Sequence, residues 1–300
     1  FFFSSRRRHT RFRNVTGVQT CALPILIDHL NSVEPIDGWF TEHYGGEDND
    51  GSSIQADGLK KPWQKHNTMK LDGVRQEIES LGLSEVEEAV CLTSLILALD
   101  KVDNTLGHFS SYLAKWYPKS YKTFNLEVPL LYENQLDHEV LCDDIFNVLP
   151  GIETDLTYYD PPYMSGNEKT PHSRVRYLPY YHLWKSICLN DKPSLFGKAK
   201  RREESSDTKN YSPFEDYRVD KGGLHVSVQS IGKLVEETQS KYILLSYSTR
   251  SQGILTELID TLKSKANLIQ TYEIDHNLNA IYFMKWLEGG GVGNLNGHKE

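Results

Sequence analysis

The stretch DLTYYDPPYMSGN, residues 155–167, is a short apolar strand pattern that ends in an acid, two prolines and a tyrosine. Proline cannot donate a backbone hydrogen bond, and it pushes the residue before it into extended geometry. The chain is therefore expected to be stiff where Asp160 and Tyr163 leave the strand. On its own the pattern is typical of a Pro-rich strand exit, so its meaning depends on the rest of the sequence.

Strand and helix patterns alternate along the chain. Apolar residues at three- and four-residue steps predict helices, and they recur in residues 69–81, 85–104, 224–235 and 254–262, with an aromatic helical segment at 177–187. Strand patterns cover residues 123–131, 138–145, 154–159, 241–248, 268–275 and 280–286. This order predicts an α/β fold with a mainly parallel sheet, helices on both faces and an antiparallel hairpin at the sheet edge.

Residues 69–118 form a predicted helical insert with little strand content. Ser84 and Glu87 have the spacing of a capping box, which would start the helix at 85–104. Because this helix is apolar nearly all round toward its end, we expect it to be central and buried.

Polar side chains collect at the predicted carboxyl ends of the strands, where ligands bind in parallel α/β sheets. Asp144, Asp160, Tyr163 and Ser246 all fall at such positions. Asp143 and Asp144 have a second interpretation, because either of them can cap a helix that begins at Ile145. Both interpretations stay open at the level of sequence.

The first 25 residues differ from the rest of the chain. They hold five arginines, no acid and no periodic apolar face, and they look like translated sequencing adapter rather than a targeting segment or a nucleic-acid-binding arm. We expect residues 1–25 to be a non-native, disordered segment that does not pack on the domain. Without these arginines the net charge changes from −8 to −13, which excludes binding to nucleic acid by bulk charge alone.

Two local basic patches remain candidates for nucleic-acid contact, KAKRR at 198–202 and HSRVR at 172–176, although each also reads as a solvated loop. The four cysteines lie far apart without a CxxC pair, which argues against zinc and a disulfide framework and suits a reducing cytosol. No apolar run reaches the length of about eighteen residues that a membrane helix needs.

DPPY after an apolar strand, in this α/β context, resembles the catalytic motif of amino-group DNA methyltransferases, which use S-adenosylmethionine. Its aspartate resembles the adenine-specific branch of that family. Further segments are similar to the same family: LCDDIFNVLPGIETDLTYY to its acid-ended strand, helix and catalytic strand, YLPYYHLWKSI to the aromatic segment after the motif, KYILLSYSTRSQGI to a later strand, and residues 71–107 to a helical insert before the motif. The resemblance covers about residues 26–286 and implies a Rossmann-like methyltransferase sheet.

The sequence departs from the family in one respect. The family opens its sheet with a strand and a Phe-x-Gly-x-Gly turn that cradles the cofactor, followed by an acid that binds the ribose. Neither occurs before Leu26, so we expect an N-terminally truncated member with an incomplete sheet and poor binding of S-adenosylmethionine. The expected regions are a target-recognition and helical insert region at 26–135, a catalytic α/β domain at 136–286 and a disordered tail at 287–300.

The resemblance implies a role for each motif residue. The Asp160 carboxylate and the Pro161 carbonyl would accept the two hydrogens of the target amine, in a geometry that Pro161 and Pro162 fix. Tyr163 would stack on the base, a contact worth about 1–3 kcal/mol, after the base has left the duplex. Tyr163 as a core aromatic is the alternative. Asp144, Ile145 and Asp160 would meet the cofactor.

Other residues are weaker candidates for contact with base or phosphate, and all of them also read as ordinary packing or solvated residues. They are Tyr177, Tyr181, His182, Arg174, Arg176, Lys200 and Arg201. His182 is expected to be a hydrogen-bonded structural histidine, because no second metal ligand lies at a suitable spacing. No metal site is predicted.

The expected function is methylation of the exocyclic amine of adenine in double-stranded DNA, as the modification half of a restriction-modification system. A cognate restriction endonuclease is an expected partner, no membrane is expected to be involved, and the expected location is the cytoplasm of a bacterium or archaeon. Two alternatives stay open. One is methylation of the cytosine amine or of RNA, and the other is a non-catalytic fragment that binds DNA weakly.

Overall fold

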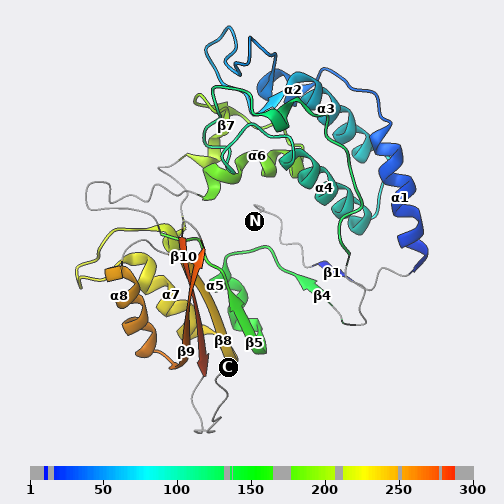
Figure 1. Ribbon diagram of the computed structural model, residues 1–300. Helices are drawn as coiled ribbons and strands as arrows, with labels where there is room; N and C mark the ends of the chain where they lie inside the picture. The colour runs from blue at the N-terminus through cyan, green and yellow to red at the C-terminus, as the bar shows by residue number, and fades with distance from the viewer. Residues whose placement is uncertain are drawn as a thin grey trace. The chain divides into compact units, whose positions relative to one another are not determined.

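The computed structural model describes residues 10–12, 17–131, 136, 138–164, 177–206, 212–248, 252–276 and 279–287. The chain divides into two compact units (Figure 1). Unit 1 comprises Phe1–Cys142 and Leu178–Asn210, and unit 2 comprises Asp143–Tyr177 and Tyr211–Glu300. The division expected at residue 136 differs from this, because Leu178–Asn210 belongs to unit 1. The predicted tail, except for Leu287, lies outside the described residues.

Unit 2 contains a four-stranded sheet. Its strand order is β5 (Glu153–Tyr159), β8 (Gln239–Ser248), β10 (Asn279–Leu287) and β9 (Asn267–His276). Strands β5 and β8 are parallel, whereas β10 runs antiparallel to both β8 and β9. The predicted hairpin and its antiparallel direction are therefore confirmed, within a mixed α/β unit.

Two helices of unit 2, α7 (Val226–Glu237) and α8 (Gln252–Lys263), lie side by side against the sheet (Figure 1). The strand β8 alternates, so that Ile243, Leu245 and Tyr247 are buried in one cluster with apolar residues of both helices. On the other face of the sheet Leu156 is 57% exposed and Tyr158 is 53% exposed. The sequence predicted helices on both faces of the sheet. Among the described residues of unit 2, helices α7 and α8 pack against one face.

The exposed face of β5 predicts self-association. Among the described strands, β5 lies at the end of the strand order and pairs on one side only. An unpaired edge beside exposed apolar side chains is a template for pairing with another chain. We expect Leu156→Lys to reduce self-association, measured by analytical ultracentrifugation, without lowering the melting temperature. Leu130→Lys is the matched control, because Leu130 is 78% exposed and lies outside the sheet. An equal response to both substitutions would rule out a role for the β5 edge.

Unit 1 is mainly helical. Its helices are α1 (Gly17–Asn31), α2 (Trp39–Tyr44), α3 (Lys65–Ser80), α4 (Glu85–Asp100) and α6 (Tyr177–Leu189), of which Tyr177 belongs to unit 2. The predicted capping box is present at α4, where Ser84 and Glu87 satisfy each other's backbone N–H groups. The helix α4 was expected to be central and buried, and the structure shows this in part: Leu95 and Leu99 are buried in the core, whereas Leu97 is 51% exposed. One face of the helix packs in the core, as in an ordinary amphipathic helix.

Short elements complete the two units. In unit 1, β2 (Gly45–Gly46) pairs in parallel with β3 (Trp63–Gln64), and β6 (Leu195–Phe196) pairs antiparallel with β7 (Arg201–Arg202). Unit 2 has the helix α5 (Ile145–Val148). The 3-10 helices are Pro118–Tyr121, Leu149–Gly151, Glu203–Ser205 and Pro213–Glu215. Of the helices in the described part of the chain, none has the length and apolarity needed to cross a membrane.

The strand predicted at residues 123–131 is absent, although its alternation is real. Phe124 and Leu126 are buried, but no strand is assigned to the segment. Its backbone bonds to side chains instead of to a neighbouring strand: the Leu126 N–H donates to Asn31 Oδ1 at 2.8 Å, and the Phe124 N–H donates to Asn67 Oδ1 at 3.0 Å. Side-chain amides thus satisfy an extended segment without a sheet.

The strand predicted at 138–145 does not join the main sheet. Strand β4 (His138–Val140) is shorter and pairs antiparallel with β1 (Thr10–Phe12). Asp144 therefore does not end a strand of the four-stranded sheet, contrary to the prediction.

The expectation that residues 1–25 do not pack is wrong for Leu23, which is 3% exposed. Leu23, Ile27 and Leu30 recur at helical spacing and are all buried on α1. This apolar stripe crosses the boundary drawn at residue 25, which is why the first 25 residues alone show no periodicity. The foreign origin of the segment stays a prediction.

Candidate active site at the end of β5

The register between two parallel strands brings Asp160 and Ser246 to the same end of the sheet. Tyr159 of β5 pairs with Leu245 of β8, so the next residue of each strand lies at the same level. Asp160 is exposed, whereas Ser246 is 3% exposed. Both residues were predicted at this edge, and they are now joined by a third side chain, that of Tyr163.

The Tyr163 hydroxyl lies between the two side chains. It donates to Asp160 Oδ1, and Ser246 Oγ lies 3.1 Å from it. Burial and the hydrogen bond to Asp160 raise the pKa of Tyr163 well above its ordinary value. The phenol is therefore protonated at neutral pH and acts as a donor to the carboxylate.

The backbone after the prolines is held by tyrosines. The Tyr163 N–H donates to the Tyr177 hydroxyl at 3.4 Å, and the Met164 N–H donates to the Tyr247 hydroxyl at 3.3 Å. The rings of Tyr163 and Tyr247 meet edge to face, with centroids 5.5 Å apart and an interplanar angle of 74°. Burial raises the pKa of Tyr247 to about 12, so this hydroxyl also stays neutral.

Sequence reasoning missed Tyr247, Met164 and Ser227 as parts of this site. Ser227, at the start of α7, donates to the Met164 sulfur at 2.8 Å. The signal that was available is the alternation of β8, which places Tyr247 on the face that packs against the helices.

Asp144 caps the helix α5. Its Oδ1 accepts the Phe146 N–H at 2.9 Å, and Asp143 Oδ1 accepts the Asp144 N–H at 2.7 Å. The capping alternative is therefore confirmed. Asp144 is exposed, and no contact of its second oxygen appears in the described residues, so contact with a cofactor stays a prediction for this residue and for Ile145.

The candidates on α6 divide between the two units. Tyr177 contributes the contact to Tyr163 described above, and Tyr181 is 38% exposed. His182 is 1% exposed, and its Nε2 lies 3.1 Å from the Phe109 carbonyl oxygen. The structural-histidine prediction is confirmed, and contact of His182 with DNA is not compatible with this burial. In the part of the chain that is described, no cluster of metal-ligating side chains occurs.

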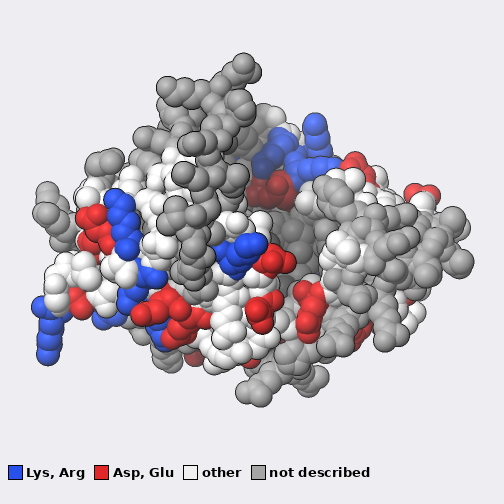
Figure 2. Space-filling view, turned by 90° about the horizontal axis from the view of Figure 1, so that it is seen from below, with Lys and Arg blue, Asp and Glu red and all other residues white. Residues whose placement is uncertain are grey.

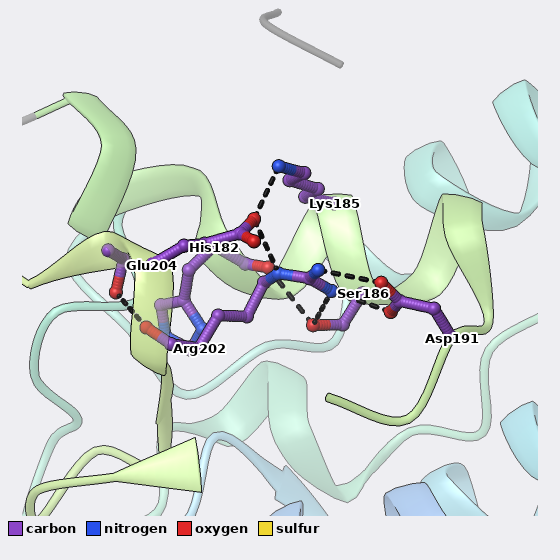
Figure 3. A network of polar contacts seen from close by, with 7 residues as sticks. His182, Lys185, Ser186, Asp191, Arg202 and Glu204 are labelled. Carbon is purple, nitrogen blue, oxygen red and sulfur yellow. Dashed lines mark hydrogen bonds and ion pairs between the residues drawn. The ribbon is translucent and has the colours of Figure 1, made fainter. Parts of the chain in front are cut away.

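The basic segment at 198–202 is engaged within unit 1. Arg202 is 3% exposed and forms a bidentate ion pair with Asp191, with both N–O distances at 2.7 Å (Figure 3). Glu204 accepts from Arg202 Nε at 3.1 Å and also pairs with Lys185. These two cations and two anions form a neutral network, which explains how Arg202 and Lys185 can be buried despite their charges.

The neighbouring candidates have mixed outcomes. The Lys200 carbonyl accepts from the Tyr44 hydroxyl at 2.7 Å, and the Arg201 guanidinium lies 4.8 Å from the centroid of the Phe196 ring. Arg174 and Arg176 lie outside the described residues. On the face drawn in Figure 2, basic side chains lie among acidic ones. Contact of Lys200 and Arg201 with DNA stays a prediction.

The buried network predicts a stability effect. We expect Asp191→Ala to lower the free energy of unfolding by about 3 kcal/mol, because it leaves a buried guanidinium without its bidentate partner; this is the low end for a buried pair, since Asp191 itself is 38% exposed. Glu127→Ala is the matched control in the same unit, since its pair with Lys101 is exposed on both sides and is worth less than about 1 kcal/mol. Urea denaturation measures both, and equal losses would show that the Asp191 pair adds nothing through burial.

Comparison with known proteins identifies a family and several relatives of this chain. The family model for D12 class N6 adenine-specific DNA methyltransferases matches residues 27–214. The modification methylase StsI of Streptococcus sanguinis is 29% identical over 214 residues, covering 70% of this chain and 29% of that protein. The type II methyltransferase M.FokI of Planomicrobium okeanokoites is 27% identical over 218 residues, which cover 69% of this chain and 30% of M.FokI.

The chain belongs to the D12 class of N6 adenine-specific DNA methyltransferases, because the family model matches more than half of it. A third relative, the type II methyltransferase M.NlaIII of Neisseria lactamica, is 27% identical over 254 residues, covering 82% of this chain and 67% of that protein. The chain spans only about 29% of the length of the StsI methylase. No solved structure matches it.

Proposed function

We propose that this chain carries the catalytic edge of an enzyme that transfers a methyl group from S-adenosylmethionine to the exocyclic amine of adenine in double-stranded DNA. The observation that carries the proposal is the exposed Asp160 carboxylate at the end of β5, followed by two prolines and Tyr163, in a member of this family. We further infer that the sheet of unit 2 is part of a Rossmann-like methyltransferase sheet.

The chemistry asks for positioning rather than for a strong base. The lone pair of the adenine amine is delocalised into the ring, which makes it a poor nucleophile. Asp160 and the Pro161 carbonyl would each accept one amine hydrogen, so that the nitrogen becomes pyramidal and its lone pair is directed at the methyl group. Fixed acceptors of this kind act by orientation and electrostatic stabilisation.

Tyr163 would stack on the face of the base. The base first leaves the duplex, at a cost of a few kcal/mol, and stacking on an aromatic side chain returns about 1–3 kcal/mol. Tyr163 is half-buried, and its ring packs edge to face with the ring of Tyr247. A stacking platform that is already held in place loses little entropy on binding.

The cofactor would be held in part by Asp144, Ile145 and Asp160. The fit rests on the exposed Asp144 carboxylate, of which only Oδ1 is engaged in the described structure. When bound, S-adenosylmethionine supplies an electrophilic methyl group on a sulfonium. On the protein side, Asp144 would orient the adenine ring of the cofactor through its free oxygen, and Asp160 would hold the target amine.

We also infer that the whole protein is the modification half of a restriction-modification system, with a cognate endonuclease as partner. The support is that the relatives are modification methylases and type II methyltransferases by name.

Product analysis tests the proposed reaction. The protein expressed from the gene that contains this sequence is incubated with radiolabelled S-adenosylmethionine and unmethylated genomic DNA, and the DNA is digested to nucleosides. We expect the label in N6-methyldeoxyadenosine. Label in N4-methyldeoxycytidine, or in RNA when RNA replaces DNA, would overturn the adenine assignment, and an absence of label would contradict the enzymatic function.

A further inference from the structure

The Tyr163 hydroxyl connects Asp160 to the buried end of β8. We propose that Ser246 is a positioning residue, which acts on the Asp160 carboxylate through this hydroxyl. The inference rests on the proposed function, because it assigns a role in the same site. It adds a residue on a second strand, 86 positions after Asp160, to a motif that is otherwise continuous in sequence.

The direction of the hydrogen bonds follows from the groups involved. An ionised carboxylate only accepts, so the one proton of the Tyr163 hydroxyl goes to Asp160 Oδ1. The oxygen of Tyr163 then accepts from Ser246 Oγ, 3.1 Å away. Ser246 is 3% exposed, so water does not readily replace it as the donor. The result is a chain of two hydrogen bonds that share one direction, in which each bond polarises the next.

Ser246 and its neighbour fix the position of the Tyr163 phenol. The Tyr163 hydroxyl contacts Ser246, and its ring contacts Tyr247, so two consecutive residues of β8 hold the side chain. Asp160 is exposed, and in the described residues its carboxylate contact is to Tyr163. The orientation of the carboxylate therefore depends on this phenol. Oδ1 is occupied, which leaves Oδ2 open for the hydrogen of the target amine.

The arrangement separates two functions of Tyr163. Its ring would stack on the base, and its hydroxyl would orient Asp160. If Ser246 acts only through that hydroxyl, removing Ser246 has no further effect once the hydroxyl is gone. A double-mutant cycle detects this dependence.

The kinetic arm uses Ser246→Ala, Tyr163→Phe and the double variant in the methyl-transfer assay. We expect Ser246→Ala to lower kcat about 5- to 20-fold with little change in the KM for S-adenosylmethionine, and Ser246→Thr to restore most of it. In the Tyr163→Phe background the same serine substitution should change kcat less than about twofold. Ser240→Ala is the matched control: Ser240 is a buried serine of the same strand that bonds to Thr154 at the other end. Independent, multiplicative losses from Ser246 and Tyr163 would overturn the proposal.

A second arm does not require turnover. In protein labelled with carbon-13 at the tyrosine ζ position, the Tyr163 resonance is identified by its loss in Tyr163→Phe. We expect Ser246→Ala and Asp160→Asn to shift this resonance, and Ser240→Ala to leave it in place. An unchanged resonance in Ser246→Ala would refute the hydrogen-bond chain. The expected shifts without any methyl transfer would instead uphold the chain and contradict the proposed function.

Discussion

Asp160→Ala is expected to lower the rate of methyl transfer by at least about 100-fold, because fixed charge stabilisation at a reacting centre is worth about 10²–10³ in rate for a single group. The fold should stay intact, since Asp160 is exposed at the sheet edge and its removal opens no cavity. The loss should appear in kcat more than in the KM for DNA, because the carboxylate acts on the amine and not on the phosphates.

Asp155→Ala is the matched control for this substitution, because Asp155 is an exposed aspartate of the same strand, away from its carboxyl end. It should retain full activity. If Asp160→Ala keeps its rate within about tenfold of the native protein, the proposed role of the carboxylate is wrong.

The second large effect concerns acid stability and originates at His182. Burial, together with the nearby charges of Arg201 and Arg202, lowers the pKa of His182 to about 3. The Phe109 carbonyl can only accept, so Nε2 carries the proton, and Nδ1 is buried without a partner in the described structure. Protonation of the buried His182 ring would place a third cation near Arg201 and Arg202.

The sign of the pH dependence follows from this lowered pKa. An unfolded histidine takes up a proton below its ordinary pKa of about 6.5, whereas the folded ring stays neutral until about pH 3. The contribution of His182 to stability is therefore complete above pH 6.5 and is lost as the pH falls. Between pH 7 and pH 5 the loss should be about 2 kcal/mol.

His182→Gln isolates this effect, because the glutamine amide can donate to the Phe109 carbonyl but does not titrate. Urea denaturation at several pH values should give a stability curve for the variant that is flatter than that of the native protein by about 2 kcal/mol over this range. Parallel curves would show that His182 takes up a proton in the folded state as readily as in the unfolded one.

Elements with a clear period were predictable from the sequence. The stripes of α3, α7 and α8 and the alternation of β8 each identify their element, because local pattern and burial agree there. The prediction failed at residues 123–131, where alternation is present but Asn31 and Asn67 take the place of a neighbouring strand. The tertiary structure decides which groups accept the backbone hydrogen bonds of an extended segment. The local sequence pattern carries no information on these partners.

The candidate site was predictable in a similar, partial way. The position of Asp160 after β5 followed from its sequence, because acid and prolines mark a strand exit. The contact between Tyr163 and Ser246 depends on the register of β5 against β8, which no local pattern specifies. Likewise, the burial of Arg202 depends on Asp191 and Glu204, so a basic run was read as a surface patch when part of it is internal.

The central claim is that Asp160, at the carboxyl end of β5, holds adenine for methylation. The most direct test of this claim does not require knowledge of the DNA sequence that the enzyme recognises. A host without DNA methylation expresses the gene containing this sequence, in its native form or with Asp160→Ala, and its genome is read by long-read sequencing that detects modified bases. The native gene should place N6-methyladenine at one short sequence throughout the genome, and the Asp160→Ala form, at equal protein level, should place none. Equal adenine methylation in both hosts, or modified cytosine in place of adenine, would contradict the account.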